Sequence, residues 1–464
     1  MTLVKKRHDV DMTTGSIVKN IIIFALPLLL GNLFQQLYNM VDTWVIGQTG
    51  ESGAYAAVGS VGPVINILIG FFMGFSSGAG VVISQYYGAK NSEGVKRTVH
   101  TAVTVTLILC VFFTVAGVLM TPLLLKLMLA SESGVGEIYP YAKTYLAIYF
   151  AGVSSLMVYN VGSGILRAVG DSTRPFIFLV VSALTNIVLD VLFVFGFDMG
   201  VTGVALATVI SQTVSAVLTV ATLMTTQGDY RLSPKALCVD GEKLIKILKV
   251  GVPSGLQMSL TSFSNVFVQS YIGGVAGDQT ASLGGWTTYS KVDMIIFLPA
   301  HSISLAVTTF VAQNLGIGDV KRARKGTYIS FFMSLAAAAA LMIPVLIFAP
   351  QVARLFNADP AVVECATKLL HAITPFYLLT CVNQNFSGAL RGAGNSTAPM
   401  LIMLSSFVAF RQIYLFVVSN YISNELIPVA MGYPAGWLLC ATLTLIYFLR
   451  YDMSRSLLSE KKNK

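Results

Sequence analysis

Long apolar stretches recur along the whole chain and are separated by short segments that carry most of the charged residues. Each stretch reaches about 20 residues, the length that a helix needs to cross the hydrocarbon core of a bilayer. Some contain Gly or Pro, which membrane helices tolerate because neighbouring helices satisfy the freed backbone groups. The pattern predicts an all-α integral membrane fold with twelve transmembrane helices, at residues 17–46, 55–86, 99–121, 138–160, 176–197, 201–225, 247–272, 285–313, 327–349, 366–388, 399–420 and 432–450.

Composition agrees with this prediction and excludes several classes of protein. Of the 464 residues, 55% are hydrophobic and only 11% are charged, against about 25% charged in soluble proteins. A soluble enzyme or a disordered chain of this size is therefore excluded. The five cysteines are scattered and form no CxxC pair, so neither a disulfide framework nor a zinc site is indicated.

The net charge is +9, and the distribution of the Lys and Arg residues along the chain predicts its orientation. Alternate connections and both termini carry 24 Lys and Arg residues, whereas the opposite side carries four. Because cytoplasmic loops are enriched in cations, we expect a multi-pass protein of the cell (inner or plasma) membrane with both termini in the cytoplasm. No basic face is interleaved with aromatic residues, so no nucleic-acid partner is expected. The first apolar run is too long for a signal-peptide core and predicts a retained helix.

The second half of the chain repeats the first. Residues 166–175 (LRAVGDSTRP) recur as residues 390–399 (LRGAGNSTAP), and Gln85-x-x-Gly88 recurs as Gln313-x-x-Gly316, at offsets of 224 and 228 residues. At an offset of 226, Pro27 aligns with Pro253. Six helices in each half make the repeats parallel, an arrangement typical of transporters with a substrate site between the halves. We predict two six-helix bundles, 1–226 and 250–464, joined by a cytoplasmic linker, 227–249, with a short amphipathic helix.

These doubled loops, together with Pro27 and Asp42-x-x-x-x-Gly47, resemble the multidrug and toxic compound extrusion (MATE) transporters over nearly the whole chain. The resemblance implies that the two halves form a V-shaped pair of bundles, which alternates between outward- and inward-facing states. It also implies that H+ or Na+ drives the change.

Three carboxylates lie inside predicted spans: Asp42, Asp190 and Asp293. A charge at the bilayer centre costs at least about 2.5–3.5 kcal/mol, so each indicates a role. Asp42 ends a polar stripe of the first helix that includes Asn32, either Gln35 or Gln36, and Asn39, spaced to share one face. The alternative is that Asp42 is merely solvated at the helix end.

Asn186 and Asp190 are four residues apart and share a face of the fifth helix. The MATE resemblance implies a cation or proton site of Asp42, Asn186, Asp190 and Thr208. Two carboxylates in one dry pocket repel each other, which favours binding and release of a proton, and the oxygens of Asp42, Asn186 and Asp190 also suit Na+. The alternative is that these groups only cross-link helices. Beyond this coupling ion we expect no cofactor.

The second half does not repeat these acids. Asp42 aligns with Val268, and Asn186 and Asp190 align with Phe410 and Tyr414, so coupling is expected in the first half. For Lys291 and Asp293 the sequence leaves charge balance and substrate contact open. For Arg411 it favours snorkelling or an interhelical hydrogen bond. The residues proposed to line a substrate cavity are Gln35, Tyr38, Asn39, Gln257, Asn265, Tyr289 and Asp293, although most aromatic residues in the spans are expected to pack.

The sequence therefore predicts a monomeric secondary active exporter, and not an enzyme, which antiports small organic compounds, cationic or amphipathic, against H+ or Na+. The runner-up is a lipid-linked oligosaccharide flippase, although two cations against three acids within the spans disfavour a pyrophosphate substrate. A membrane enzyme lacks motif support. A channel is also possible, but a two-fold repeat with buried acids is more typical of a transporter that works by alternating access.

Overall fold

The structure is a computed structural model and describes residues 10–48, 52–128 and 135–454. Every regular element of these residues is a helix, and the predicted all-α membrane fold is confirmed. In the described ranges, eleven helical runs are long and apolar enough to cross a membrane. The predicted span 247–272 corresponds to α7 (Gly241–Gly273), which is not among the eleven. The terminal cations Lys5, Lys6, Arg7, Arg455, Lys461, Lys462 and Lys464 lie outside the described residues.

The first half of the chain forms six long helices. A π-helical turn, η1 (Leu192–Gly196), extends the fifth, and a short 3-10 turn, η2 (Pro234–Ala236), lies in the connection to the second half. The long helices are α1 (Ile17–Gln48), α2 (Ser52–Gly88), α3 (Ser92–Met128), α4 (Val135–Ala168), α5 (Thr173–Val191) and α6 (Gly200–Thr225).

The second half starts with three long helices, α7, α8 (Gln279–Gly316) and α9 (Val320–Ile347). Its later spans are divided into shorter pieces. Pro375 lies in the 3-10 turn that separates α11 from α12, since proline lacks the N–H that a continuous helix needs. The pieces are α10 (Ala349–Arg354), α11 (Pro360–Ile373), η3 (Thr374–Phe376), α12 (Tyr377–Gly392), α13 (Thr397–Met403), η4 (Leu404–Phe410), α14 (Arg411–Val417), η5 (Val418–Ile422), α15 (Leu426–Ala430) and α16 (Gly432–Arg450).

The chain divides into two compact units. Unit 1 comprises the described residues up to Asp11 together with Pro27–Gly251, and unit 2 comprises Met12–Leu26 together with the described residues from Val252 onwards. One boundary falls at Pro27 inside α1, and the other falls just before Pro253 inside α7. Each proline removes a backbone hydrogen bond of its helix, so both divisions lie at weakened points.

These units differ from the predicted bundles at the N-terminus and at the linker. The start of α1 belongs to unit 2, and the predicted linker belongs to unit 1. The linker is held there by hydrogen bonds: Ser233 N–H donates to His100 Nε2 (3.1 Å), and Asp240 N–H donates to Thr101 Oγ1 (3.1 Å). Residues 241–249 of the predicted amphipathic helix are helical, but they form the first turns of α7 and not a short helix of their own.

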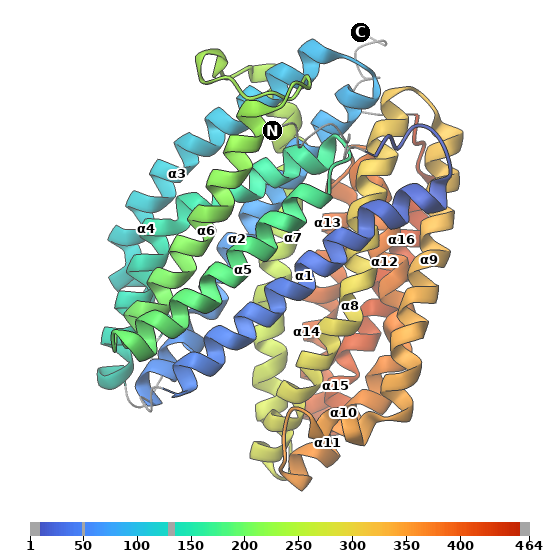
Figure 1. The fold of residues 1–464 in the computed structure, drawn as a ribbon. Coiled ribbons are helices and arrows are strands. Elements are labelled where there is room, and N and C mark those ends of the chain that lie inside the picture. Colours follow the sequence, from blue (N-terminus) through green and yellow to red (C-terminus); the bar gives the residue numbers. More distant parts are fainter. Residues whose placement is uncertain (1–9, 49–51, 129–134, 455–464) are drawn as a thin grey trace. The chain divides into compact units, whose positions relative to one another are not determined.

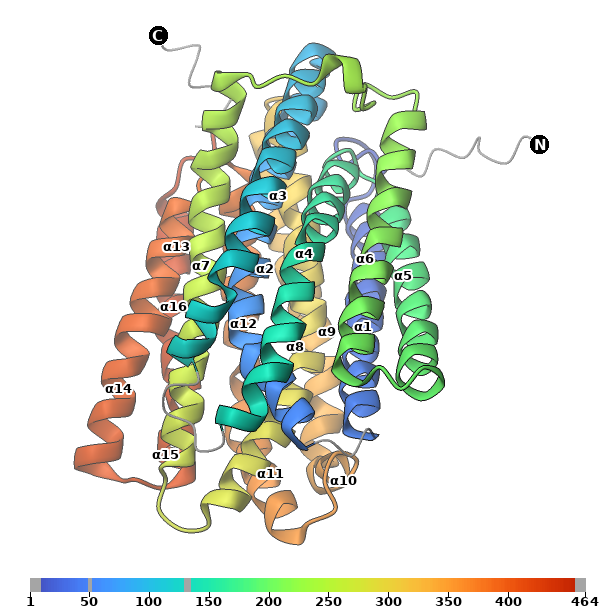
Figure 2. The same ribbon diagram turned by 90° about the vertical axis from the view of Figure 1, so that its left-hand side faces the viewer.

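In unit 1, α4 is the central helix and packs against α2, α3 and α6, as Figure 2 shows. It crosses α2 closely. A Cβ on Gly164 would lie 3.1 Å from the carbonyl oxygen of Ser76, and Ser76 Oγ donates to the Asn160 carbonyl (2.6 Å). The bare glycine therefore lets the two backbones approach closely.

In unit 2, α12 has the corresponding role and packs against α8, α9 and α16 (Figure 1). A Cβ on Gly388 would lie 2.7 Å from the Ser304 carbonyl oxygen, and Ser304 Oγ donates to the Gln384 carbonyl (2.6 Å). Gly388 aligns with Gly164 at the 224-residue offset, and Ser304 aligns with Ser76 at the 228-residue offset. The sequence repeat is therefore a structural repeat.

The repeated loops have the same backbone geometry. After α4, Asp171 N–H donates to the Leu166 carbonyl (2.9 Å) and Gly170 adopts a positive φ of 98°. After α12, Asn395 N–H donates to the Leu390 carbonyl (2.9 Å) and Gly394 adopts a φ of 90°. This is the Schellman ending, in which a left-handed residue lets the chain close a helix and turn away.

Candidate ion-coupling site

Three of the four residues predicted to couple the ion come together in unit 1. Asp42 projects from α1, and Asn186 and Asp190 project from one face of α5. The side chains of Asn186 and Asp190 are fully buried, and Asp42 is half-buried. The four-residue spacing along α5 places both of its polar groups toward Asp42, as the helical period requires.

The three side chains interact, but their hydrogen bonds are incomplete. The Asp42 carboxyl interacts with the Asp190 carboxyl and with the Asn186 amide. Yet the inner oxygen Oδ1 of Asp42, both carboxyl oxygens of Asp190 and both amide atoms of Asn186 lack a hydrogen bond of good geometry. We interpret the contacts as close but poorly aligned. Buried polar atoms are normally satisfied, so a cluster of unsatisfied ones indicates a place for a proton or a cation.

Thr208, the fourth predicted residue, is buried on α6. Its hydroxyl donates to the Val204 carbonyl of its own helix (3.0 Å), so its proton does not reach the acids. No cluster of three or more His, Cys, Asp or Glu residues occurs in the described part of the chain. A cation at Asp42 and Asp190 would therefore complete its oxygen ligands with amide or hydroxyl groups.

A tyrosine of α4 borders the acid pair, and the sequence prediction missed it. Tyr145 is buried and lies within electrostatic reach of Asp42, Asp190 and Tyr38. Tyr149, one helical turn further along, contacts the Gln212 side chain of α6. The signal in the sequence was the four-residue spacing of these tyrosines, which places both on one face of α4.

The polar stripe of α1 is only partly directed into unit 1. The Gln35 side chain contacts the Tyr38 hydroxyl, and Tyr38 in turn lies within electrostatic reach of Asp42. Asn32 is half-buried, whereas Asn39 is exposed. Among the proposed cavity residues of the first half, Gln35 and Tyr38 therefore belong to the surroundings of the acid pair, and Asn39 lies on the surface of unit 1.

The proposed cavity residues of the second half lie in unit 2 and have separate partners. Gln257 is buried and its amide contacts the sulfur of Met403. The carbonyl oxygen of the Asn265 side chain accepts a hydrogen bond from Arg411 (2.8 Å). Their role as a substrate cavity stays a prediction.

The charged span residues Lys291, Asp293 and Arg411 also lie in unit 2. The Tyr289 hydroxyl donates to Asp293 Oδ1 (3.2 Å). Lys291 lies over the Phe356 ring, 5.9 Å from its centre, so Lys291 and Asp293 have different neighbours. Arg411 is buried and donates to Ser264 Oγ (2.7 Å), which matches the interhelical hydrogen bond favoured by the sequence.

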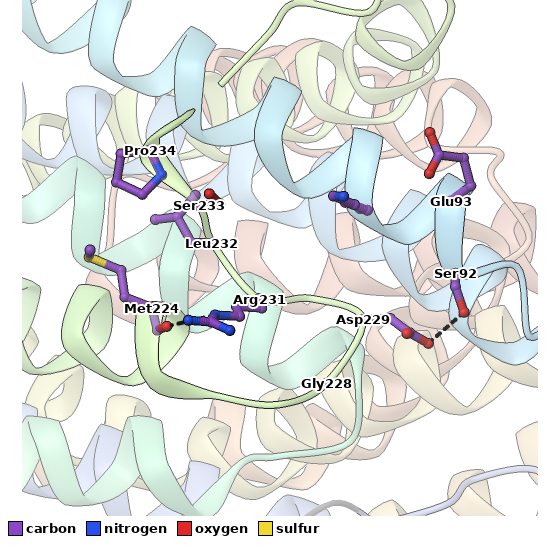
Figure 3. Close-up of a pocket in the computed structure, with 10 residues that line it drawn as sticks. Ser92, Glu93, Met224, Gly228, Asp229, Arg231, Leu232, Ser233 and Pro234 are labelled. Atoms are coloured by element: carbon purple, nitrogen blue, oxygen red, sulfur yellow. Dashed lines mark hydrogen bonds between the residues drawn. The ribbon is translucent and has the colours of Figure 1, made fainter. Parts of the chain in front are cut away.

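A cavity of about 530 Å3 lies apart from the acid pair, where the connection after α6 meets the start of α3. Figure 3 shows its walls, with Ser92 donating to Asp229 (2.8 Å) and Arg231 donating to the Met224 carbonyl (3.1 Å). Both signs of charge line it, so it is not a strong attractor for one sign of ligand. The lining residues are Ser92, Glu93, Lys96, Met224, Gly228, Asp229, Arg231, Leu232, Ser233 and Pro234.

The two halves of the chain each match a known family of proteins. The MatE family model matches the chain twice, over residues 27–192 and 253–417. The two matches together cover most of the chain and correspond to the two repeats. The chain belongs to the MATE family. The resemblance inferred from the sequence motifs is thereby confirmed.

Several known proteins resemble the chain over nearly its full length. A probable multidrug resistance protein, YoeA, of Bacillus subtilis is 30% identical over 93% of both chains. A probable multidrug resistance protein, NorM, of Thermotoga maritima is 28% identical over 93% of this chain and 92% of that protein. A solved outward-facing multidrug resistance MATE transporter shares 25% identity and superposes with a TM-score of 0.87, covering 96% of this chain and 98% of that one.

Proposed function

We propose that this MATE protein is a secondary active multidrug exporter that exchanges organic, cationic or amphipathic compounds for H+ or Na+ by alternating access. The observation that carries the proposal is the pair Asp42 and Asp190, with Asn186 beside it and with inner oxygens that lack hydrogen bonds. The reported relatives support export of drugs, because they are described as multidrug resistance proteins.

The acid pair can work as a switch because its charge changes when it binds the ion. Two adjacent carboxylates repel each other, and one shared proton or one bound cation removes that repulsion. Binding shifts the equilibrium between two states only if the ion binds one state more tightly. In the proposed cycle, the loaded pair favours one state, and substrate favours the other.

The proposal includes the protein class, the substrates, the oligomeric state and the membrane orientation. It is a membrane transporter rather than an enzyme, its substrates are small molecules, and it works as a monomer. Both termini face the cytoplasm, because 24 Lys and Arg residues lie on that side in the predicted topology. The reported relatives do not favour the flippase alternative, since they are described as multidrug resistance proteins.

Transport of substrate into inverted membrane vesicles, whose cytoplasmic face points outward, tests the coupling. A pH gradient and then a sodium gradient are imposed separately, and the one that drives efflux identifies the ion. Asp42→Asn and Asp190→Asn should still bind substrate but lose gradient stimulation by about 5–150-fold, the usual range of coupling between two sites. Full gradient-driven efflux by Asp42→Asn would contradict the proposal.

The matched control is Asp198→Asn, which changes an exposed carboxylate of unit 1 outside the pair. Asp198 has a positive φ of 52°, a conformation that asparagine also accepts, so the substitution should leave the backbone unchanged. This variant should show wild-type efflux under both gradients.

A further inference from the structure

Asp293 is the intramembrane acid that the proposed coupling site does not use. It lies on α8 in unit 2 and is half-buried. At the 228-residue offset it aligns with Ile65 of the first half, and Tyr289 aligns with Val61. Unit 2 thus carries an acid and a hydroxyl where unit 1 carries aliphatic side chains. An acid kept in a membrane helix indicates a function.

A chain of hydroxyl groups leads to Asp293. The Tyr289 hydroxyl donates its single proton to Asp293 Oδ1 (3.2 Å). The Tyr377 hydroxyl of α12 lies 3.4 Å from the Tyr289 hydroxyl. Tyr377 must therefore be the donor to Tyr289. If the acid takes up a proton, all donors in the chain can reverse, since each hydroxyl both donates and accepts. The chain can therefore stabilise both forms of the acid.

Aromatic rings enclose this chain. Trp286 lies 5.2 Å from Tyr289, and Trp437 lies 5.1 Å from Tyr377, measured between ring centres. All four rings are buried, and Tyr433 packs against both tryptophans. Buried aromatic rings exclude water from the hydroxyl groups, so the low local dielectric strengthens the chain.

Arg411 is a positive charge that borders this network through Tyr433, and it does not pair directly with the acid. Its guanidinium lies 4.7 Å from the centre of the Tyr433 ring, and Tyr433 is within electrostatic reach of both Arg411 and Asp293. In the described residues, Asp293 takes part in no salt bridge. A direct ion pair would hold the acid in its charged form, whereas a cation beyond a ring leaves it free to take up a proton.

Other ionisable groups on the packed helices have partners elsewhere. On α11, Glu364 and Lys368 form an exposed pair (2.7 Å), and His371 contacts the Leu346 carbonyl (3.0 Å). Lys291 lies against Phe356. The groups that face Asp293 are thus the tyrosines of its hydroxyl chain, with Tyr433 and Arg411 behind them.

We propose that Asp293 is a second proton site of this transporter, built within unit 2, with Tyr289 and Tyr377 as its hydrogen-bonding relay. Its carboxylate binds one proton from water and forms a neutral carboxyl, and the reverse step returns that proton. The consequence for transport rests on the proposed function: each cycle would exchange one proton more than the acid pair alone provides.

Infrared difference spectroscopy of the purified full-length protein in lipid nanodiscs tests the site directly. Spectra are recorded between acidic and alkaline buffer in an Asp42→Asn/Asp190→Asn background, which removes the acid pair. A band of a protonated buried carboxyl should remain there and disappear when Asp293→Asn is added. Its persistence after Asp293→Asn, or its absence at every pH before that change, would overturn the proposal.

Two further variants make the test specific. Tyr289→Phe removes the hydroxyl that stabilises the carboxylate, so the band should persist into more alkaline buffer, and an unchanged pH range would argue against the relay. The pH range of the band in Tyr289→Phe also tests the proposal if the triple variant, which combines Asp293→Asn with the two other Asp→Asn changes, does not fold. Glu364→Gln, which alters an exposed acid of unit 2, should leave the band unchanged.

Transport separates this inference from the proposed function. With a pH gradient of one unit, the loss of one exchanged proton in Asp293→Asn should lower the steady-state substrate gradient about tenfold, because each proton contributes about 1.4 kcal/mol. An unchanged substrate gradient would contradict the second site. The failure of Asp42→Asn to uncouple efflux would instead contradict the proposed function, whatever Asp293→Asn shows.

Discussion

In unit 1 the acids Asp42 and Asp190 interact across α1 and α5, whereas the aligned positions of unit 2 hold Val268 and Tyr414. In unit 2 the acid is Asp293, and its aligned residue in unit 1 is Ile65. The two repeats thus have different polar sites. Arg411 follows the same pattern, since it aligns with Ile187 at the 224-residue offset.

The shared features are contacts to the backbone. Ser76 and Ser304 both donate to a carbonyl of the neighbouring helix (2.6 Å each), and Gly170 and Gly394 both close a helix with a positive φ. Backbone partners are present whatever the side chains are, so such contacts survive in two diverged copies. Networks between side chains need several matching residues at once. The comparison indicates that the scaffold is duplicated and the chemistry is not.

The largest expected effect comes from placing an acid of the unit 1 type into unit 2. Val268 is fully buried in a hydrophobic cluster, and Val268→Asp would introduce a carboxylate without a partner. We expect a loss of about 4 kcal/mol or more in the free energy of unfolding, because an unpaired buried charge is among the most destabilising changes. Thermal unfolding in nanodiscs measures this.

Val268→Ala is the control for that substitution, because it removes volume without adding charge. It should unfold at a clearly higher temperature than Val268→Asp. Equal stability of Val268→Asp and wild type would show that unit 2 accepts an acid at the aligned position, and the contrast between the units would be lost.

A smaller effect is expected at the duplicated helix crossings. Gly164→Ala and Gly388→Ala each place a Cβ against the carbonyl oxygen of a serine, 3.1 Å and 2.7 Å away. Overpacking of this kind costs about 1–3 kcal/mol, and both variants should lower the unfolding temperature. Gly62→Ala, whose Cβ would meet nothing within 4 Å, should not. If only one crossing is sensitive, the units do not share a scaffold.

The smallest effect concerns the loops after α2 and α8. Both helices end in a Schellman turn, but the left-handed residue is Lys90 in unit 1 (φ 53°) and Gly318 in unit 2 (φ 84°). A side chain in this conformation costs about 1–2 kcal/mol. Lys90→Gly should therefore stabilise unit 1 by about 1 kcal/mol, and Gly318→Ala should destabilise unit 2 similarly, as followed by thermal unfolding. Lys90→Ala keeps the Cβ and should be neutral.

Much of the fold and part of the candidate site follow from local pattern. Apolar length predicts the spans, and the four-residue spacing of Asn186 and Asp190 predicts a shared face, which the structure shows. The continuity of the linker helix with α7 does not follow from the sequence, because no local signal shows whether a surface helix continues into the next span. Tyr145 was missed because its relation to Asp42 depends on how α4 is rotated relative to α1.

The sequence by itself determined that the chain is a duplicated membrane protein with three intramembrane acids. Only the tertiary structure decided which acids meet, that Arg411 bonds to Ser264 and Asn265, and that the start of α1 belongs to unit 2. The physical reason is the range of the forces involved. Burial and helical period act along one segment and are visible in it, whereas the rotation and crossing of helices depend on the packing of residues that are far apart in the chain.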